Sequence, residues 1–336
     1  MSKTTTASKK ASKDTKESKQ KVNWEGIIME GLSNPGLTFD RKGYALRNLD
    51  LKAKGLDSLH VTFIKFENIS YMDLSENGIQ DFSVLKDMPY LITLNMSKCN
   101  VRDIKGLAAE EGFRNLQHLN LSDNKIVELS PIKAPKLITI NLTDNRIEKG
   151  ESFDGHPTLM RLELRRNKIG TTAFLGNMPS LRELHLAENK IKTITGLDGL
   201  ANLKILNLRK NLIDGFEEGP APNESIEYLN LRENKISKFE EIVKLQAYAG
   251  LKTLIFSYNP ITTTMEHTYF FETLTAFPKI NRINKHSVTK PVRLKWIKYA
   301  EDKYLAEKRK QEEEERRQKE LEDRELAAQQ AADDNQ

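Results

Sequence analysis

The sequence has a single cysteine, Cys99, among its 336 residues. One cysteine excludes an intramolecular disulfide framework and a zinc site built from cysteines, and it is typical of a reducing compartment. No run approaches the roughly 18 consecutive apolar residues of a transmembrane helix. The lysine-rich start is not followed by the apolar core of a signal peptide. We therefore expect a soluble chain that is not secreted and does not bind a membrane.

The motifs of common catalytic sites are missing as well. The sequence contains no GxxxxGK[ST] phosphate loop, no HExxH zinc motif and no GxSxG nucleophile elbow. Of the six histidines, only His118 and His185 fall on predicted strands. They lie three repeats apart, which is too far for a shared metal ion. We expect no catalysis, no metal and no cofactor.

The positive charge of the chain is concentrated at its start. Residues 1–22 contain seven lysines and two acidic residues, whereas the rest of the chain is balanced, for a net charge of +5. The Ser, Thr and Lys composition predicts a disordered tail over 1–22. The tail has no aromatic residues, so nucleic-acid binding by base stacking is not expected. Two roles stay open: attachment to an acidic polymer such as the tails of tubulin, or solubilisation.

A repeat fills the middle of the chain. The segment LQHLNLSDNKI at 116–126 recurs in ten copies of the form LxxLxLxxNxI, spaced by 21 to 25 residues. A period near 22 is typical of leucine-rich repeats. Alternate residues of a strand share one side, so each copy predicts a short strand of a parallel concave sheet with its leucines inward. The spacing in Ile191–Leu203 predicts short helical or 3₁₀ turns on the convex side.

One column of the repeat is almost entirely asparagine. An asparagine amide can satisfy backbone groups that are left unpaired where the chain bends out of a strand, which predicts a structural ladder. Lys54 and Cys99 occupy the other two of ten positions, and we expect Cys99 to be buried and structural. The asparagines of the ladder are Asn77, Asn124, Asn145, Asn167, Asn189, Asn211, Asn234 and Asn259.

The ends of the array have different compositions. An open solenoid exposes its core at both ends unless it is capped. The fold class is therefore an α/β leucine-rich-repeat solenoid of about ten repeats, capped at both ends and followed by a long charged helix. The predicted boundaries are 1–22 for the tail, 23–45 for the N-terminal cap, 46–262 for the repeats, 263–286 for the C-terminal cap, 287–330 for the helix and 331–336 for a disordered end.

The concave face is the first candidate surface for a partner. Its C-terminal rungs interleave arginine with glutamate, and arginine offers bidentate anchors to a partner. In a second interpretation, Arg165, Arg209 and Arg232 pair with Glu163, Glu188 and Glu233 across the rungs, and both interpretations stay open. The candidate residues are Arg165, Arg166, Arg209, Lys210, Arg232 and Tyr258.

The start of the long helix is the second candidate surface. Its apolar side contains Leu294, Trp296, Ile297 and Tyr304. Such residues are unusual on the surface of a monomer, so we expect docking on the cap or on a partner. The distal half has few large apolar residues, and it predicts either a solvated helix or a strut along a neighbour.

The repeat resembles the SDS22-like subclass of leucine-rich repeats. From about residue 24 to 320, the chain also resembles the leucine-rich repeat-containing protein 23 family. The resemblance rests on EGIIMEGLS from Glu25, ISYMDLSENGIQDFSVLKDMPYL from Ile69 and IEYLNLRENKISKFEEIVKL from Ile226. Members of that family begin with an acidic segment where this chain has lysines. The role of the tail therefore does not follow from the resemblance.

The resemblance implies a non-catalytic structural scaffold in the axoneme of a cilium or flagellum. It implies a radial spoke subunit, part of a large hetero-complex and bound to other axonemal or spoke proteins through the solenoid and the helix. The alternative is a soluble regulatory adaptor, such as a phosphatase regulator, a dynein light chain or a nuclear ribonucleoprotein assembly factor. The long helix favours the spoke subunit, because a compact adaptor does not need it.

Overall fold

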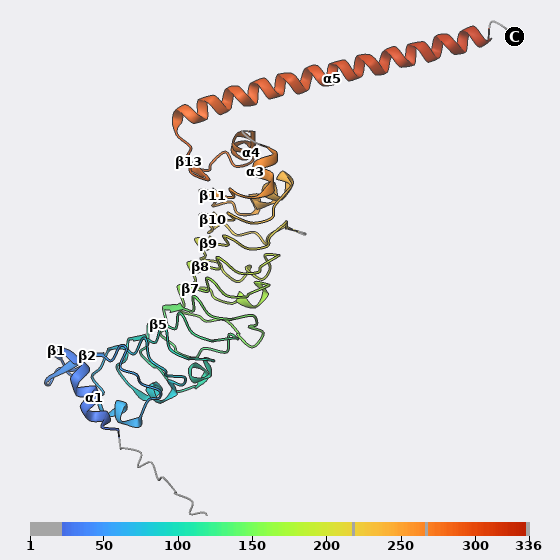
Figure 1. Cartoon of the computed structure of the whole chain (residues 1–336). Coiled ribbons are helices and arrows are strands. Elements are labelled where there is room, and N and C mark those ends of the chain that lie inside the picture. The colour runs from blue at the N-terminus through green and yellow to red at the C-terminus, as the bar shows by residue number, and fades with distance from the viewer. Residues whose placement is uncertain (1–21, 217–218, 266–267, 334–336) are drawn as a thin grey trace, which may run out of the picture.

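The computed structural model describes residues 22–216, 219–265 and 268–333. The chain is a curved solenoid in which 13 strands, stacked in sequence order, form one sheet along the concave side (Figure 1). The predicted tail over 1–22 lies outside the described residues except for Val22. Of the predicted disordered end over 331–336, residues 334–336 also lie outside them.

The rungs of the solenoid are three-residue strands with a buried middle residue. The middle leucine, isoleucine or methionine is at most 2% exposed in every rung. Neighbouring rungs pair in parallel. The rungs are β3 (Tyr71–Asp73), β4 (Thr93–Asn95), β5 (His118–Asn120), β6 (Thr139–Asn141), β7 (Arg161–Glu163), β8 (Glu183–His185), β9 (Ile205–Asn207), β10 (Tyr228–Asn230) and β11 (Thr253–Ile255).

The asparagine column links each rung to the one before it. Asn167 shows the pattern: its Oδ1 accepts a hydrogen bond from the Ile147 amide at 2.9 Å, and its Nδ2 donates to the carbonyls of Leu142 and Leu164. The other seven asparagines make the same kind of contact. At the one cysteine position, the Sγ of Cys99 donates to the Leu74 carbonyl at 3.3 Å.

A helix and a hairpin cover the N-terminal end. The helix α1 (Trp24–Gly31) is capped by Asn23 and buries Ile28 completely. It leads into β1 (Leu32–Leu37), which pairs in antiparallel with β2 (Tyr44–Asp50), and β2 then starts the parallel ladder. The sequence pattern predicts the helix but not the hairpin, because the Ser-Asn-Pro-Gly run in β1 is typical of a turn.

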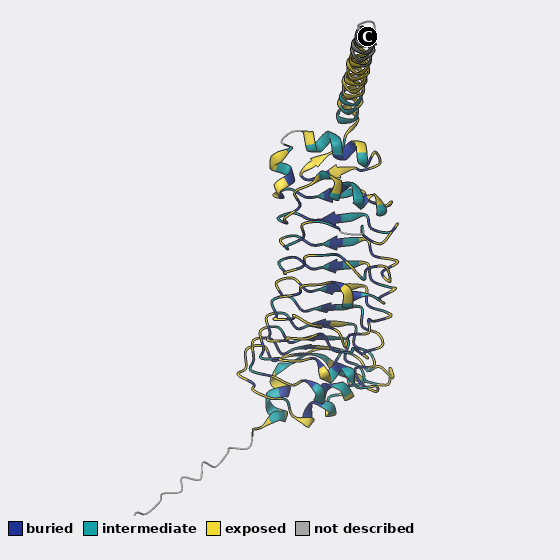
Figure 2. Ribbon diagram, turned by 90° about the vertical axis from the view of Figure 1, so that its right-hand side faces the viewer, coloured by how far each residue is buried: buried dark blue, intermediate teal, exposed yellow. Residues whose placement is uncertain are grey.

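The convex side is less regular than the concave sheet (Figure 2). It contains 3₁₀ helices and one short α-helix, namely η1 (Val61–Lys65), η2 (Ser83–Asp87), η3 (Lys105–Ala108), η4 (Ala173–Leu175), α2 (Phe239–Lys244) and η5 (Leu245–Ala247). In Ile191–Leu203, 3₁₀-type turns form in the second half, where the Leu200 amide donates to the Leu197 carbonyl and the Leu203 amide to the Leu200 carbonyl, whereas the first half is extended. Thr193 there forms an extended bridge with Thr171, and Gly196 has a φ of +69°, which interrupts a helix.

The C-terminal cap consists of α3 (Pro260–Thr264), α4 (Thr268–Ala276) and the short strands β12 (Arg282–Ile283) and β13 (His286–Ser287). Asn284 extends the ladder into the cap, because its Oδ1 accepts from the Phe256 and Ser257 amides. The long helix α5 spans Lys290–Asp333. It starts and ends three residues later than the predicted range of 287–330, so residues 331–333 are helical. Figure 1 shows α5 projecting well past the solenoid.

Candidate partner-binding surfaces

The rim of the concave face is formed by residues in a left-handed conformation. The residue before each ladder position has a φ between 52° and 60° from β3 to β11, although none of them is glycine. This conformation is unusual for residues with a Cβ, and the ladder bonds that follow hold it in place. These residues are Glu76, Lys98, Asp123, Asp144, Arg166, Glu188, Lys210, Glu233 and Tyr258.

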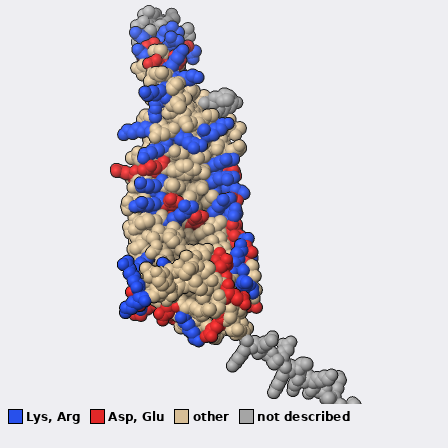
Figure 3. All heavy atoms as spheres, turned by 90° about the vertical axis from the view of Figure 1, so that its left-hand side faces the viewer, with Lys and Arg blue, Asp and Glu red and all other residues tan. Residues whose placement is uncertain are grey.

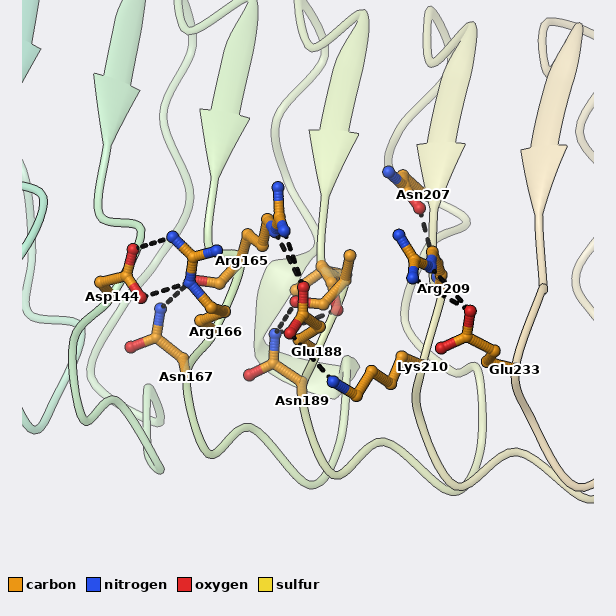
Figure 4. Close-up of polar contacts among 12 residues, drawn as sticks. Asp144, Arg165, Arg166, Asn167, Glu188, Asn189, Asn207, Arg209, Lys210 and Glu233 are labelled. Carbon is orange, nitrogen blue, oxygen red and sulfur yellow. Dashed lines mark hydrogen bonds and ion pairs between the residues drawn. The ribbon is translucent and has the colours of Figure 1, made fainter.

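Cross-rung ion pairs cover the C-terminal half of this face (Figure 4). Glu188 lies between two cations, with Arg165 Nη2 at 2.8 Å and Lys210 Nζ at 3.2 Å from its carboxylate oxygens. The hydrogen bond from Arg165 is the main reason why the pKa of Glu188 lies below its ordinary value. One carboxylate thus connects three consecutive rungs.

Glu233 is a second carboxylate with two cations beside it. Glu233 accepts from Arg209 Nη2 at 3.0 Å and lies 3.1 Å from Arg232 Nε. The guanidinium of Arg232 also lies 4.6 Å from the centre of the Tyr258 ring, a cation–π contact. Closer to the N-terminus, Arg166, which follows β7, pairs with Asp144, which follows β6. All six candidate residues on the concave face therefore lie in three neighbouring groups of contacts, which together are called the concave network.

The structure contains cross-rung pairs of the kind that the second interpretation expects, but two partners differ. Arg209 pairs with Glu233 rather than Glu188, and Arg232 contacts Glu233 on its own rung. Arg165 pairs with Glu188 on the following rung, whereas Glu163 pairs with Arg161 at 2.7 Å. Across the network, five cations meet three carboxylates, and the paired guanidinium side chains keep 39% to 45% of their surface exposed. The network is therefore ordered before any partner binds and carries an excess of positive charge.

Charge is distributed unevenly along the concave face. Figure 3 looks onto this face, where Lys and Arg gather over the C-terminal half and Asp and Glu gather along one side of the N-terminal half. In the N-terminal half, Glu76 lies between Lys98 and Lys52, and the hydrogen bond from Lys98 lowers the pKa of Glu76. A partner with opposite charge distribution fits this face in one direction only.

The first turns of α5 dock on the C-terminal cap. Trp296 Nε1 donates to Thr275 Oγ1 at 3.1 Å, and the ring of Tyr299 stacks on Phe271 with 4.9 Å between centroids. Glu272 accepts hydrogen bonds from the Tyr299 hydroxyl at 3.1 Å and from Lys303 Nζ at 2.6 Å. The helix therefore leaves the cap in a defined direction.

The apolar residues of α5 do not form the single side that the sequence suggests. Trp296 packs against the cap, whereas Leu294, Ile297 and Tyr304 are 68%, 44% and 66% exposed. At 100° per residue Leu294 and the half-exposed Leu305 lie opposite Trp296, whereas Ile297 and Tyr304 lie roughly a quarter turn away from it. The outer stripe of α5, defined as Leu294, Ile297, Tyr304 and Leu305, remains available to a partner.

Two family models match the repeats of this chain. A model of the leucine-rich repeat matches residues 158–213, and a model of two leucine-rich repeat copies matches residues 114–155. The parallel sheet and the asparagine ladder extend the same pattern over the other rungs. The chain has the leucine-rich-repeat fold.

Curated relatives are similar to part of this leucine-rich-repeat chain. Leucine-rich repeat-containing protein 23 of Bos taurus is 29% identical, and that of Homo sapiens 30% identical, over 130 residues. The match covers 39% of this chain and 36% of each relative. The chain thus matches these relatives over about a third of their length.

Solved leucine-rich-repeat structures share the fold at low sequence identity. The TLR13 chain in a complex with the RNA ssRNA13 has a TM-score of 0.55 and 19% identity, and the match covers 71% of this chain and 40% of that chain. The LRIM1/APL1C complex has a TM-score of 0.52 and 17% identity, covering 68% and 42%. The APL1 leucine-rich-repeat domain has 0.52 and 19%, covering 64% and 56%. These likenesses concern the fold alone.

Sequence reasoning missed the residues that orient the helix of this leucine-rich-repeat chain. Glu272 lies 27 residues before Tyr299 and 31 before Lys303, and no local spacing connects them. Within the described ranges, no group of three or more His, Cys, Asp or Glu is placed to hold a metal ion. In the same part of the chain, no helix is long and apolar enough to cross a membrane.

Proposed function

We propose that this chain is a non-catalytic scaffold of the ciliary axoneme, most specifically a radial spoke subunit that holds neighbouring spoke proteins. The similarity to leucine-rich repeat-containing protein 23 carries the proposal, because the family resemblance implies a spoke component. The fold supports a binding role, since solenoids of this kind offer extended concave surfaces to partners.

In this proposal, two surfaces of the chain bind two different spoke proteins. The concave network from Arg165 to Tyr258 faces one spoke protein with ordered, half-exposed cations. The outer stripe of α5 faces another, on a helix about 66 Å long at 1.5 Å per residue. The candidate Trp296 supports this stripe from the cap side and does not contact the partner itself.

The length and exposure of α5 favour a strut in an assembly. From Glu301 to Leu321 all described side chains of the helix are exposed, and i,i+4 pairs such as Arg317 with Glu313 lie along it. Each such pair contributes only about 0.2 to 0.5 kcal/mol, so contact with a neighbour would stabilise a helix of this length. The lysine-rich tail over 1–22 adds electrostatic attachment to tubulin in this proposal.

Extraction of isolated motile cilia tests the proposal. Because a spoke subunit is held by many contacts, the chain is expected to stay with the axoneme after detergent removes the ciliary membrane. Raised salt then releases it together with spoke proteins, since its exposed ion pairs are screened. Recovery only from cytosol or nucleus would contradict the proposal and favour the soluble regulatory adaptor.

A further inference from the structure

A segment near the C-terminal end of the solenoid contains basic residues without acidic ones. Residues 279–298 include seven Lys or Arg and no Asp or Glu. The fold wraps this segment around the end of the cap, through β12, β13 and the first turns of α5. Six of the seven are exposed: Lys279, Arg282, Lys285, Lys290, Lys295 and Lys298.

These cations differ from those of the concave face in their contacts. On the concave face, every candidate arginine pairs with a carboxylate. In the described parts of the chain, by contrast, no ion pair involves any of the seven basic residues of 279–298. Arg293 donates to the backbone carbonyls of Pro278 and Ile280, which leaves its charge without a carboxylate among these residues. The end of the cap therefore carries a local excess of positive charge.

An apolar hollow lies within this basic surface. It has a volume of 440 Å³ and is lined by Tyr269, Phe270 and Phe271 of α4, by Lys285, His286 and Ser287 at β13, and by Val292 and Lys295 of α5. This volume lies within the range of about 300 to 1,000 Å³ that is usual for ligand sites. The hollow thus combines aromatic walls with two lysines.

The geometry of the aromatic rings decides what kind of group the hollow fits. The face of Phe271 is covered by Tyr299, and Phe270 stands edge-on to both Phe271 and His286, at 5.6 and 5.9 Å. Successive bases of a nucleic acid need open ring faces on which to stack. Because these rings already contact one another, the hollow fits a single inserted apolar side chain better than a run of stacked bases.

We propose that this end of the molecule binds an acidic protein segment, which inserts one aromatic or large aliphatic side chain into the hollow and places neighbouring carboxylates on Lys285 and Lys295. The charge complementarity and the apolar walls together specify the partner. The site is distinct from the concave network and from the outer stripe of α5. It does not depend on the axonemal role.

Fluorescence polarisation with two labelled peptides tests the site on the full-length chain. One probe has a central phenylalanine between runs of four glutamates, and the other has alanine in its place. The phenylalanine peptide is expected to bind about tenfold more tightly, because its ring is transferred from water into the apolar hollow. Ser287→Phe, which adds a ring to the hollow from an exposed position, is expected to remove this preference and leave the alanine peptide unaffected.

The double variant Lys285→Glu, Lys295→Glu tests the charges. It is expected to weaken both peptides by about tenfold or more. The matched control Lys190→Glu, Lys235→Glu reverses two exposed lysines on the repeats and is expected to leave binding unchanged. Thermal melting of both variants verifies that they fold.

Three results would overturn the proposal. Equal binding of the two peptides would show that the hollow takes no side chain. Equal losses in the two double variants would show attraction by net charge alone. Tighter binding of a twelve-residue homouridine RNA, or of vesicles with phosphatidylserine, through Lys285 and Lys295 would assign the surface to another class of partner.

Discussion

Asparagine fits the ladder column because its amide brings one acceptor and two donors to the same place. At Asn124 the acceptor takes the Val101 amide at 3.0 Å, and the donors serve two carbonyls. Cys99 has no amide oxygen, and its thiol donates only weakly, to the Leu74 carbonyl. At Cys99, the amide that corresponds to that of Val101 is the amide of Ile79. Among the described residues, this amide donates no hydrogen bond to Cys99.

Replacing Cys99 by asparagine is therefore expected to stabilise the solenoid. The new Oδ1 would accept from the Ile79 amide, which contributes about 1 kcal/mol to the free energy of unfolding. Urea denaturation followed by circular dichroism measures the change. Cys99→Ala serves as the control and is expected to be destabilised, since it removes the bond to Leu74. Equal stability of wild type and Cys99→Asn would contradict the account.

A buried histidine gives the fold a dependence on pH. His156 is 2% exposed, its Nε2 donates to the Ala134 carbonyl at 3.0 Å, and burial lowers its pKa from the ordinary value of 6.5. Below pH 6.5 the unfolded chain takes up a proton that the folded chain does not. The free energy of unfolding therefore falls as the pH falls from 6.5 to the lower folded pKa.

Between pH 7 and 5, wild type is expected to lose more stability than His156→Leu. The difference in slope is at most about 1.4 kcal/mol per pH unit. Thermal melts across this range measure it, and His118→Leu, at an exposed position, is the control. Identical pH profiles for wild type and His156→Leu would be inconsistent with burial of the neutral ring.

At the residue scale, the sequence predicts positions better than partners. The period places Cys99 in the ladder, where burial raises the pKa of its thiol, because every column of a repeat has one environment. The partner of Arg165 was not predictable, because long side chains reach either neighbouring rung. It contacts Glu188 on the following rung rather than Glu163 on its own rung.

The concave sheet is the element that we expect to select a partner. The triple variant Arg165→Gln, Arg209→Gln, Arg232→Gln is expected to reduce the capture of spoke proteins from ciliary extracts by at least about tenfold. Each exposed ion pair contributes under about 1 kcal/mol, so the variant stays folded. Neutralising Lys125, Lys190 and Lys235 on the repeats is the matched control. Unchanged capture by the arginine variant would show that the network only stabilises the fold.

The helix α5 shows how tertiary contacts divide one amphipathic pattern. Apolar residues at helical spacing indicate a buried side, but they do not say which of two sides meets the chain itself. Contacts with Thr275 and Glu272 place Trp296 and Tyr299 on the cap and leave the outer stripe exposed. These contacts join residues more than 20 positions apart, beyond the reach of local patterns.

Loss of the cap contacts is expected to release the first turns of α5. In Trp296→Ala, Tyr299→Ala, amide hydrogen exchange over 290–303 should be about tenfold faster or more, while the rungs keep their protection. The control Leu294→Ala, Tyr304→Ala removes a similar area from the outer stripe and should not change exchange in the isolated chain. Equal exchange in both variants would show that the helix is not held by the cap.

Irregular elements were the least predictable. The run Ile191–Leu203 has helical spacing throughout, yet only its second half turns, because the backbone preferences of Thr193 and Gly196 keep the first half extended. The antiparallel hairpin of β1 and β2 exists because the first rung needs a partner strand, which is a property of the end of the array. Local composition does not indicate that the first rung pairs with a further strand.

At the scale of the whole molecule, the repeats form a rigid curved body that is closed at each end by a different device. Pro35 lies in the outermost strand β1 and lacks an N–H to donate, which blunts that edge against further strands. At the other end, β12 and β13 extend the sheet past β11, and α4 packs over the last rung through the contact of Tyr269 with Phe256. The rungs could be predicted from the period alone, whereas the caps could be located only by where the period stops.

The position of this body in the cell is the central claim, and cryo-electron tomography of axonemes tests it most directly. Motile cilia from cells that lack the chain would be compared with cilia from the parental cells. Without the chain, density is expected to be missing from a radial spoke in every repeat of the axoneme and to return when the full chain is restored. Spokes that are intact and unchanged without the chain would contradict it.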